Sequence, residues 1–145
     1  MTDLPALVQG FRDSGDAAPL VQAIPYLRFL GLRFEVVAGA VQATMPFADH
    51  LVGNPSLPAI HGGTLGALLE ASAIVQVLWD APAPVLPKTI NLTVEYLRSG
   101  GPADTFARST ITRHGRRVIH VRSETWQEDP GRPIALGHLH LLVEG

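Results

Sequence analysis

The segment from Gly62 to Trp79 limits what this chain can fold into more than any other part of it. Its 18 residues are almost all apolar or small, yet Glu70 places one carboxylate near the middle. A charged side chain at the centre of a membrane span costs several kcal/mol. We therefore interpret the segment as the buried core helix of a folded domain, which needs other elements packed around it.

The sequence on both sides of this segment predicts a sheet. Residues 89–99 alternate apolar and polar side chains, which is typical of a half-buried strand. Its predicted buried face carries Ile90, Leu92, Val94 and Tyr96. Further strands are expected in residues 32–47, as a pair joined at Ala38-Gly39, in 104–127, as a pair joined at His114-Gly115, and in 133–144.

Helices and loops are expected in the rest of the chain. Residues 1–30 carry helix signals, with an interruption near Pro25 and an end at Gly31. Prolines and glycines predict loops over residues 48–60 and 80–88. The order of elements predicts an α+β protein with one domain over residues 1–145, in which an antiparallel sheet wraps around one long helix.

Composition excludes several classes of partner and chemistry. The formal net charge of −2 gives no general attraction to nucleic acid or to acidic membranes. The chain has no cysteine, so disulfides, thiolate metal sites and cysteine nucleophiles are excluded. The first residues lack the order of a signal peptide, and we expect a cytoplasmic protein. His138 and His140 share a strand face without an obvious third ligand, so no metal site is expected.

The central helix is expected to present a mostly small face beside its carboxylate. At 100° per residue, the side chains on the Glu70 side of the helix are Gly63, Gly66, Ala67, Ala73, Ile74 and Val77. The opposite side carries Leu65, Leu68, Val75 and Trp79. Small residues allow another backbone or a ligand to come close to Glu70.

The start of this helix predicts a second chemical feature. Amides in a first helical turn have no partner within the helix, and the helix dipole favours negative charge there. His61, Gly62 and Gly63 leave these amides uncovered by bulky side chains. Such amides suit an oxygen that gains negative charge during acyl transfer. Together with Glu70, they indicate a hydrolase that acts on an activated acyl group.

The spacing of these groups predicts a site shared by two chains. Gly62 and Glu70 are eight residues apart, which is about 12 Å along one helix. A carbonyl group and the water that attacks it need a donor and a base each roughly 3 Å away. Two antiparallel copies of the helix meet this requirement, with Gly62 of one chain facing Glu70 of the other. We therefore expect a homodimer.

Several stretches resemble the hotdog-fold acyl-CoA thioesterases of the phenylacetyl-CoA and 4-hydroxybenzoyl-CoA type. They are HGGTLGALLE after GNPSLPAI, NLTVEYLRSGGPAD and TRHGRRVIHVRSETWQ, and the likeness covers residues 25–143. The resemblance implies a hotdog fold, a dimer that often pairs into a tetramer, and hydrolysis of a coenzyme A thioester. It implies no cofactor, because coenzyme A is part of the substrate.

The resemblance also implies roles for individual residues. Glu70 is the nucleophile or the general base, Gly62 supplies the amide that polarises the thioester carbonyl, and His61 shapes the loop. Relatives carry an amide side chain six residues before the histidine; Pro55 stands there, and Asn54 is one residue earlier. Thr89 is the candidate hydroxyl for holding the attacking water. The candidate substrate contacts are Gly63 and, for coenzyme A phosphates, Arg98, Arg113, Arg116 and Arg117.

Other functions stay open at this level. NPSLPAIHGG resembles in part the hotdog hydratases and dehydratases of acyl thioesters, and a non-catalytic acyl-CoA binding protein is a further alternative. The sequence does not name the acyl group, and it leaves dimer and tetramer open. We expect the acyl pocket to depend on Leu51, Leu57, Val77 and residues of the partner chain.

Overall fold

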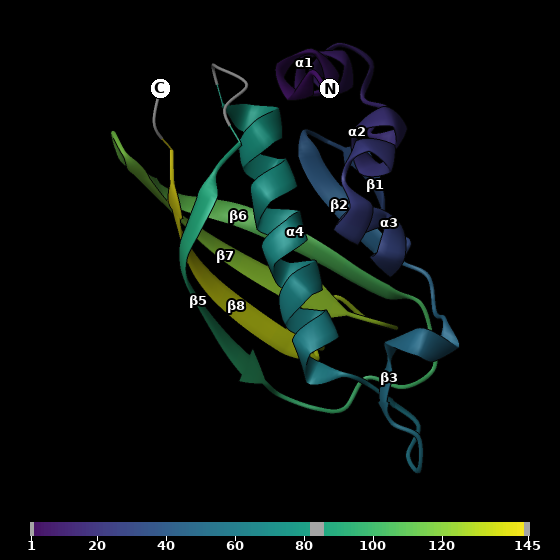
Figure 1. Ribbon diagram of the computed structural model, residues 1–145. Coiled ribbons are helices and arrows are strands. Elements are labelled where there is room, and N and C mark those ends of the chain that lie inside the picture. The colour runs from purple at the N-terminus through teal and green to yellow at the C-terminus, as the bar shows by residue number, and fades with distance from the viewer. Residues whose placement is uncertain (1, 82–85, 144–145) are drawn as a thin grey trace.

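The long apolar segment is the helix around which the fold is built (Figure 1). The computed structural model describes residues 2–81 and 86–143. Within them the helices are α1 (Leu4–Ser14), α2 (Ala18–Ala23), α3 (Pro25–Leu30), the short 3-10 helix η1 (Asp49–Leu51) and α4 (Gly62–Asp80). The strands there are β1 (Arg33–Val37), β2 (Ala40–Met45), β3 (Val52–Asn54), β4 (Ala59–Ile60), β5 (Lys88–Tyr96), β6 (Thr105–His114), β7 (Val118–Trp126) and β8 (Ala135–Leu142).

The main sheet wraps around α4, as predicted. Among the described residues it has six strands in the order β1-β2-β6-β7-β8-β5, and neighbouring strands are antiparallel. Figure 1 shows α4 crossing one face of this sheet, with α1, α2 and α3 beside it over β1 and β2. The strand β5 forms one edge of the sheet. This architecture confirms the α+β prediction and is the hotdog fold.

The N-terminal helices begin and end where the sequence signals them. Asp3 caps α1 by accepting a hydrogen bond from the Ala6 amide at 3.1 Å. Pro25 begins α3, and Gly31 ends it in the left-handed conformation with a φ of 70°. The prediction of a helical region interrupted near Pro25 is therefore confirmed.

Of the two predicted hairpins, the first has its turn at the predicted residues and the second does not. Ala38 and Gly39 have φ angles of 52° and 79°, and positive φ at both central residues is typical of a type I′ turn. In the β6–β7 hairpin, the Gly115 amide donates to the Val118 carbonyl at 3.0 Å. The turn residues are therefore Arg116 and Arg117, and the prediction of a His114-Gly115 turn was displaced by two residues.

The predicted loop over residues 48–60 is more ordered than expected. It contains η1 and a small hairpin in which Val52 pairs with Ile60. Of the other predicted loop, over residues 80–88, residues 82–85 lie outside the described part of the chain.

The alternation predicted for β5 is wrong at its two ends. The pairing of β5 with β8 shifts register between Thr89 and Asn91, and such a bulge disrupts the alternation of side chains. Ile90 is 57% exposed and Tyr96 is 55% exposed, and only Leu92 and Val94 of the predicted face are half-buried. The edge strand thus carries apolar side chains in contact with solvent in this single chain.

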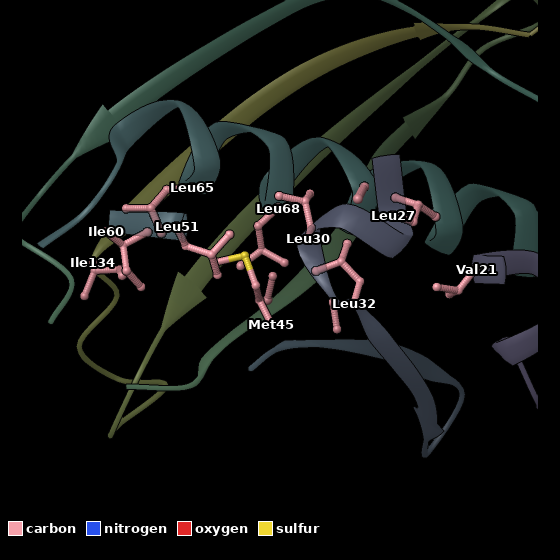
Figure 2. Close-up of a cluster of buried hydrophobic side chains, with 13 residues drawn as sticks. Val21, Leu27, Leu30, Leu32, Met45, Leu51, Ile60, Leu65, Leu68 and Ile134 are labelled. Carbon is pink, nitrogen blue, oxygen red and sulfur yellow. The ribbon is translucent and has the colours of Figure 1, made fainter. Parts of the chain in front are cut away.

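The core joins α4 to every other layer. Figure 2 shows one buried cluster in which Leu68 of α4 lies near Leu30 of α3 and Met45 of β2. In the most apolar 18-residue window of α4, 61% of the residues are buried inside the fold. Although its length and hydropathy would suit a membrane span, its packing identifies it as the core helix.

Candidate active site

Glu70 lies on a partly accessible stripe of α4. The residues that keep some exposure along this stripe are Gly63, Ala67, Glu70 and Ile74. The predicted small face is narrower than expected, because Gly66, Ala73 and Val77 are buried. Gly66 faces Val94 and Tyr96 of β5, and Ala73 and Val77 belong to the cluster that includes residues of β7 and β8.

An apolar cavity lies beside the Glu70 side chain. It has a volume of about 220 Å³ and is lined by α2, α3, α4 and the residues that precede β5. Leu20 comes from α2, Leu27 from α3 and Ile24 from the junction between them, and from α4 come Ala71, Ile74 and Leu78. Among the described lining residues, Glu70 is the one that carries a formal charge at neutral pH.

The Glu70 carboxylate is not used to hold the fold together. Among the described residues it takes part in neither a hydrogen bond nor a salt bridge. The salt bridge present in that part of the chain joins two other residues, Arg108 and Glu124, at 3.9 Å. A carboxylate with a structural role is normally paired or hydrogen-bonded. Glu70 therefore has the accessibility and the free oxygens that a general base or nucleophile requires.

The start of α4 is shaped by His61 and Tyr96. His61 caps the helix, because its Nδ1 accepts a hydrogen bond from the Gly63 amide at 2.9 Å. Tyr96 donates from its hydroxyl to the Gly62 carbonyl at 2.7 Å. No acceptor for the Gly62 amide lies in the part of the chain that the structure describes. Of the predicted pair of amides, Gly62 is thus the one that remains available, and Gly63 is occupied.

The two chemical groups lie apart within one chain. Gly62 lines a different cavity, of about 340 Å³, together with Leu65, Tyr96 and Arg98. Glu70 is not among the described residues that line it. Since both residues belong to the same regular helix, their backbones are about 12 Å apart. One protomer therefore presents the amide and the carboxylate at separate places.

A buried chain of hydroxyl groups fixes α4 next to Glu70. Ser72 is hydrogen-bonded to Ser109 at 2.8 Å, and Ser109 to Ser123 at 2.6 Å. Ser123 donates to the carbonyl of Leu69, the residue before Glu70, at 3.1 Å. Each of these hydroxyls is buried. The chain ties the turn of α4 that carries Glu70 to β6 and β7, and the sequence pattern gave no signal of it.

The two other predicted catalytic residues lie outside these cavities. Asn54 is exposed, and its Oδ1 accepts a hydrogen bond from the Ser56 amide at 3.0 Å, which is an Asx turn. Thr89 is half-buried in β5 and pairs with Leu141. It lies two residues after Pro87, which does line the Glu70 cavity. The structure does not bring either side chain to Glu70 within one chain, and their roles stay predictions.

The predicted phosphate-binding arginines divide between two ends of the sheet. Arg113, Arg116 and Arg117 line one open cavity at the β6–β7 turn. Leu142 of β8 pairs both with Val118, next to this turn, and with Lys88 at the start of β5. Arg98 lies beyond the other end of β5, two residues after Tyr96. The nine residues from Lys88 to Tyr96 separate these ends by about 27 Å. One chain therefore does not gather the four guanidiniums into one cluster.

The three residues expected to shape an acyl pocket with the partner chain lie away from the Glu70 cavity in the single chain, and that expectation stays a prediction. Leu51 and Val77 are buried in the core, and Leu57 is 64% exposed on the turn between β3 and β4. None of the three is among the described residues that line the Glu70 cavity. The sequence missed the contribution of α2 and α3, because no periodic pattern says which faces of two helices will meet. Within the described residues, no group of three or more potential ligands is placed to hold a metal ion.

Fold and site define a hotdog-fold protein with an acidic residue on its central helix. Comparison with known families then identifies the family to which the chain belongs. The family model of the acyl-CoA thioesterase N-terminal domain matches residues 54–140. The chain belongs to this family of acyl-CoA thioesterases. No curated protein matches the chain.

Solved structures show the same fold over nearly the whole chain. A protein of Chromobacterium violaceum is 32% identical, with a TM-score of 0.78, covering 95% of this chain and 96% of that one. A phenylacetic acid degradation-related protein of Ralstonia eutropha JMP134 is 24% identical, with a TM-score of 0.76, covering 94% and 99%. A Bacillus halodurans protein solved with CoA is 21% identical, with a TM-score of 0.74, covering 100% and 96%.

Proposed function

We propose that the protein hydrolyses a coenzyme A thioester to a carboxylic acid and free coenzyme A. Membership of the acyl-CoA thioesterase family supports this reaction class. The observation that carries the proposal is the placement of Glu70: a half-buried carboxylate, unpaired among the described residues, beside an apolar cavity. Binding of CoA by a relative of the same fold is consistent with the substrate.

In the proposed reaction, Glu70 acts on the thioester carbonyl in one of two ways. As a general base it removes a proton from water while the water oxygen bonds to the carbonyl carbon. As a nucleophile it forms an acyl-glutamate anhydride, which water then opens. In both routes the carbon–sulfur bond breaks, the sulfur leaves as thiolate and takes up a proton, and the carbonyl oxygen gains charge that an amide must stabilise.

The amide that receives this charge is proposed to be Gly62 of a second chain. The Gly62 amide has no acceptor among the described residues, and about 12 Å of helix separates it from Glu70 of its own chain. The edge strand β5, with Ile90 and Tyr96 exposed, offers unpaired backbone groups and apolar surface to a second copy. A two-fold dimer that places two α4 helices antiparallel would bring each Glu70 to the other Gly62.

The proposal is tested by following thiol release from a panel of acyl-CoAs. Glu70→Gln should lower kcat by at least about 10²-fold, because it removes the base or nucleophile but keeps the shape of the side chain. Wild-type turnover in this variant would exclude Glu70 from the mechanism. Hydration of an enoyl-CoA without thiol release, or binding without either reaction, would contradict hydrolysis.

A further inference from the structure

The cavity beside Glu70 has a solvent-exposed end and a buried end. Its lining includes Tyr26, which is 56% exposed, and Leu86, which is 43% exposed. It also includes Leu20 and Leu78, each only 1% exposed. The cavity thus connects solvent-exposed side chains with the buried contact between α2 and α4. A ligand that enters it has one end near the surface and the other in the core.

The lining restricts the chemistry of such a ligand. Apart from the Glu70 carboxylate and the Tyr26 hydroxyl, the described lining residues offer apolar side chains. A polar group buried there would lose its hydrogen bonds to water without gaining partners. An apolar group would instead be transferred from water into a closely packed environment. The cavity therefore favours a hydrocarbon chain or ring with its polar end at Glu70.

The volume restricts the length of that hydrocarbon. An engineered apolar cavity of about 150 Å³ in another protein binds benzene, which has six carbon atoms. In proportion, the 220 Å³ cavity holds roughly nine non-hydrogen atoms. From Glu70 to Leu78 the helix rises about 12 Å, so the cavity also has the length for an extended chain.

We propose that this cavity, formed within one chain by α2, α3 and α4, binds the apolar tail of a medium-length acyl group whose carbonyl lies at Glu70, and that the small Ala71 keeps the space behind the carbonyl open for the tail. The inference rests on the proposed function. Ala71 lines the cavity one residue after Glu70 and is nearly buried, so a larger side chain at this position projects into the space for the tail. The coenzyme A portion then lies outside the cavity, toward the proposed partner chain.

Two substitutions of opposite effect test the assignment. Ala71→Leu shortens the cavity near Glu70, and Val75→Ala enlarges it. The measurement is kcat/KM for straight-chain acyl-CoAs from butanoyl to hexadecanoyl. Because one methylene in an apolar pocket is worth about 10–200-fold, Ala71→Leu should lower the octanoyl-to-butanoyl ratio at least about tenfold. Val75→Ala should move the preference toward longer tails. The matched control, Ala6→Leu on the exposed face of α1, should keep the wild-type profile.

The outcomes separate this inference from the proposed function. Thiol release with a length profile that neither cavity variant changes would overturn the tail site and leave hydrolysis standing. If no acyl-CoA is hydrolysed, calorimetry with octanamide, whose polar end carries no charge to repel Glu70, tests the cavity alone. Binding to the wild-type protein that Ala71→Leu abolishes would support the site without the reaction. Absence of octanamide binding together with absence of hydrolysis would overturn both.

Discussion

Replacing Gly62 with proline removes one amide proton from the proposed site while leaving the helix able to form. Gly62 is the first residue of α4, where proline is favoured because the N–H has no partner within the helix. The preceding residue must be extended, and His61 has a φ of −58° and a ψ of 131°. The capping bond from the Gly63 amide to His61 does not involve the Gly62 amide.

Alanine at the same position is the matched control. A Cβ atom at Gly62 comes within 3.2 Å of the Tyr96 ring, so alanine reproduces this contact of the proline variant, and the proline ring adds Cγ and Cδ. Only proline lacks the N–H. Removal of one oxyanion-stabilising donor typically lowers kcat by about 10²–10³-fold, or about 2.7–4 kcal/mol of transition-state stabilisation. We expect this difference between Gly62→Pro and Gly62→Ala in thiol-release assays.

Mixed dimers then test whether the site is shared. If Gly62 of one chain serves Glu70 of the other, a dimer of one Glu70→Gln chain and one Gly62→Pro chain contains one doubly defective site and one intact site. Each such mixed dimer should regain up to half of the wild-type turnover, although each parent alone is nearly inactive. Equal turnover of the proline and alanine variants, or mixed dimers without recovered activity, would refute the shared-site reasoning.

Two further predictions concern stability, measured by urea denaturation at one fixed protein concentration because the chain is proposed to dimerise. Ser123→Ala removes the donor to Leu69 and a partner of Ser109, so the free energy of unfolding should fall by about 1–3 kcal/mol. The loss in the double variant with Ser109→Ala should be smaller than the sum of the two single losses. Additive losses would contradict a connected chain of hydrogen bonds. Ala38→Asn should raise the free energy of unfolding by about 1 kcal/mol, since alanine is strained at a φ of 52°. Gly39→Ala should lower it, because Gly39 has a φ of 79°, although there is open space around the added Cβ. An unchanged denaturation midpoint for Ala38→Asn would show that the turn is unstrained.

The sequence predicted those features that depend on local pattern. An apolar run with a single charge predicted α4, and glycine or proline at Gly31 and Pro25 predicted helix boundaries, because capping and backbone preferences are local. The exposure of Ile90 was not predicted, since a bulge depends on pairing with β8 and leaves no mark on the alternation within β5 itself.

The site was predictable only in part for the same reason. Glu70 and Gly62 stood out as an unusual charge and an uncovered helix start. The cavity beside Glu70 did not, because its other wall is Leu20 of α2, Leu27 of α3 and Ile24 between them, and β1 to β4 separate these residues from α4 in the sequence. Which of several apolar helix faces meet is decided by packing in three dimensions.

The separation of the Gly62 amide from the Glu70 carboxylate along α4 gives a physical reason for the proposed dimer. A single helix holds the amide donor and the carboxylate on a rigid frame, so neither group can move toward the other without breaking the helix. Their separation is therefore fixed at about two turns, too far for one thioester carbonyl. The buried serine chain fixes the same helix to the sheet. In the proposed dimer, a second rigid copy would complete the site without any movement, and preorganised donors of this kind stabilise developing charge most effectively.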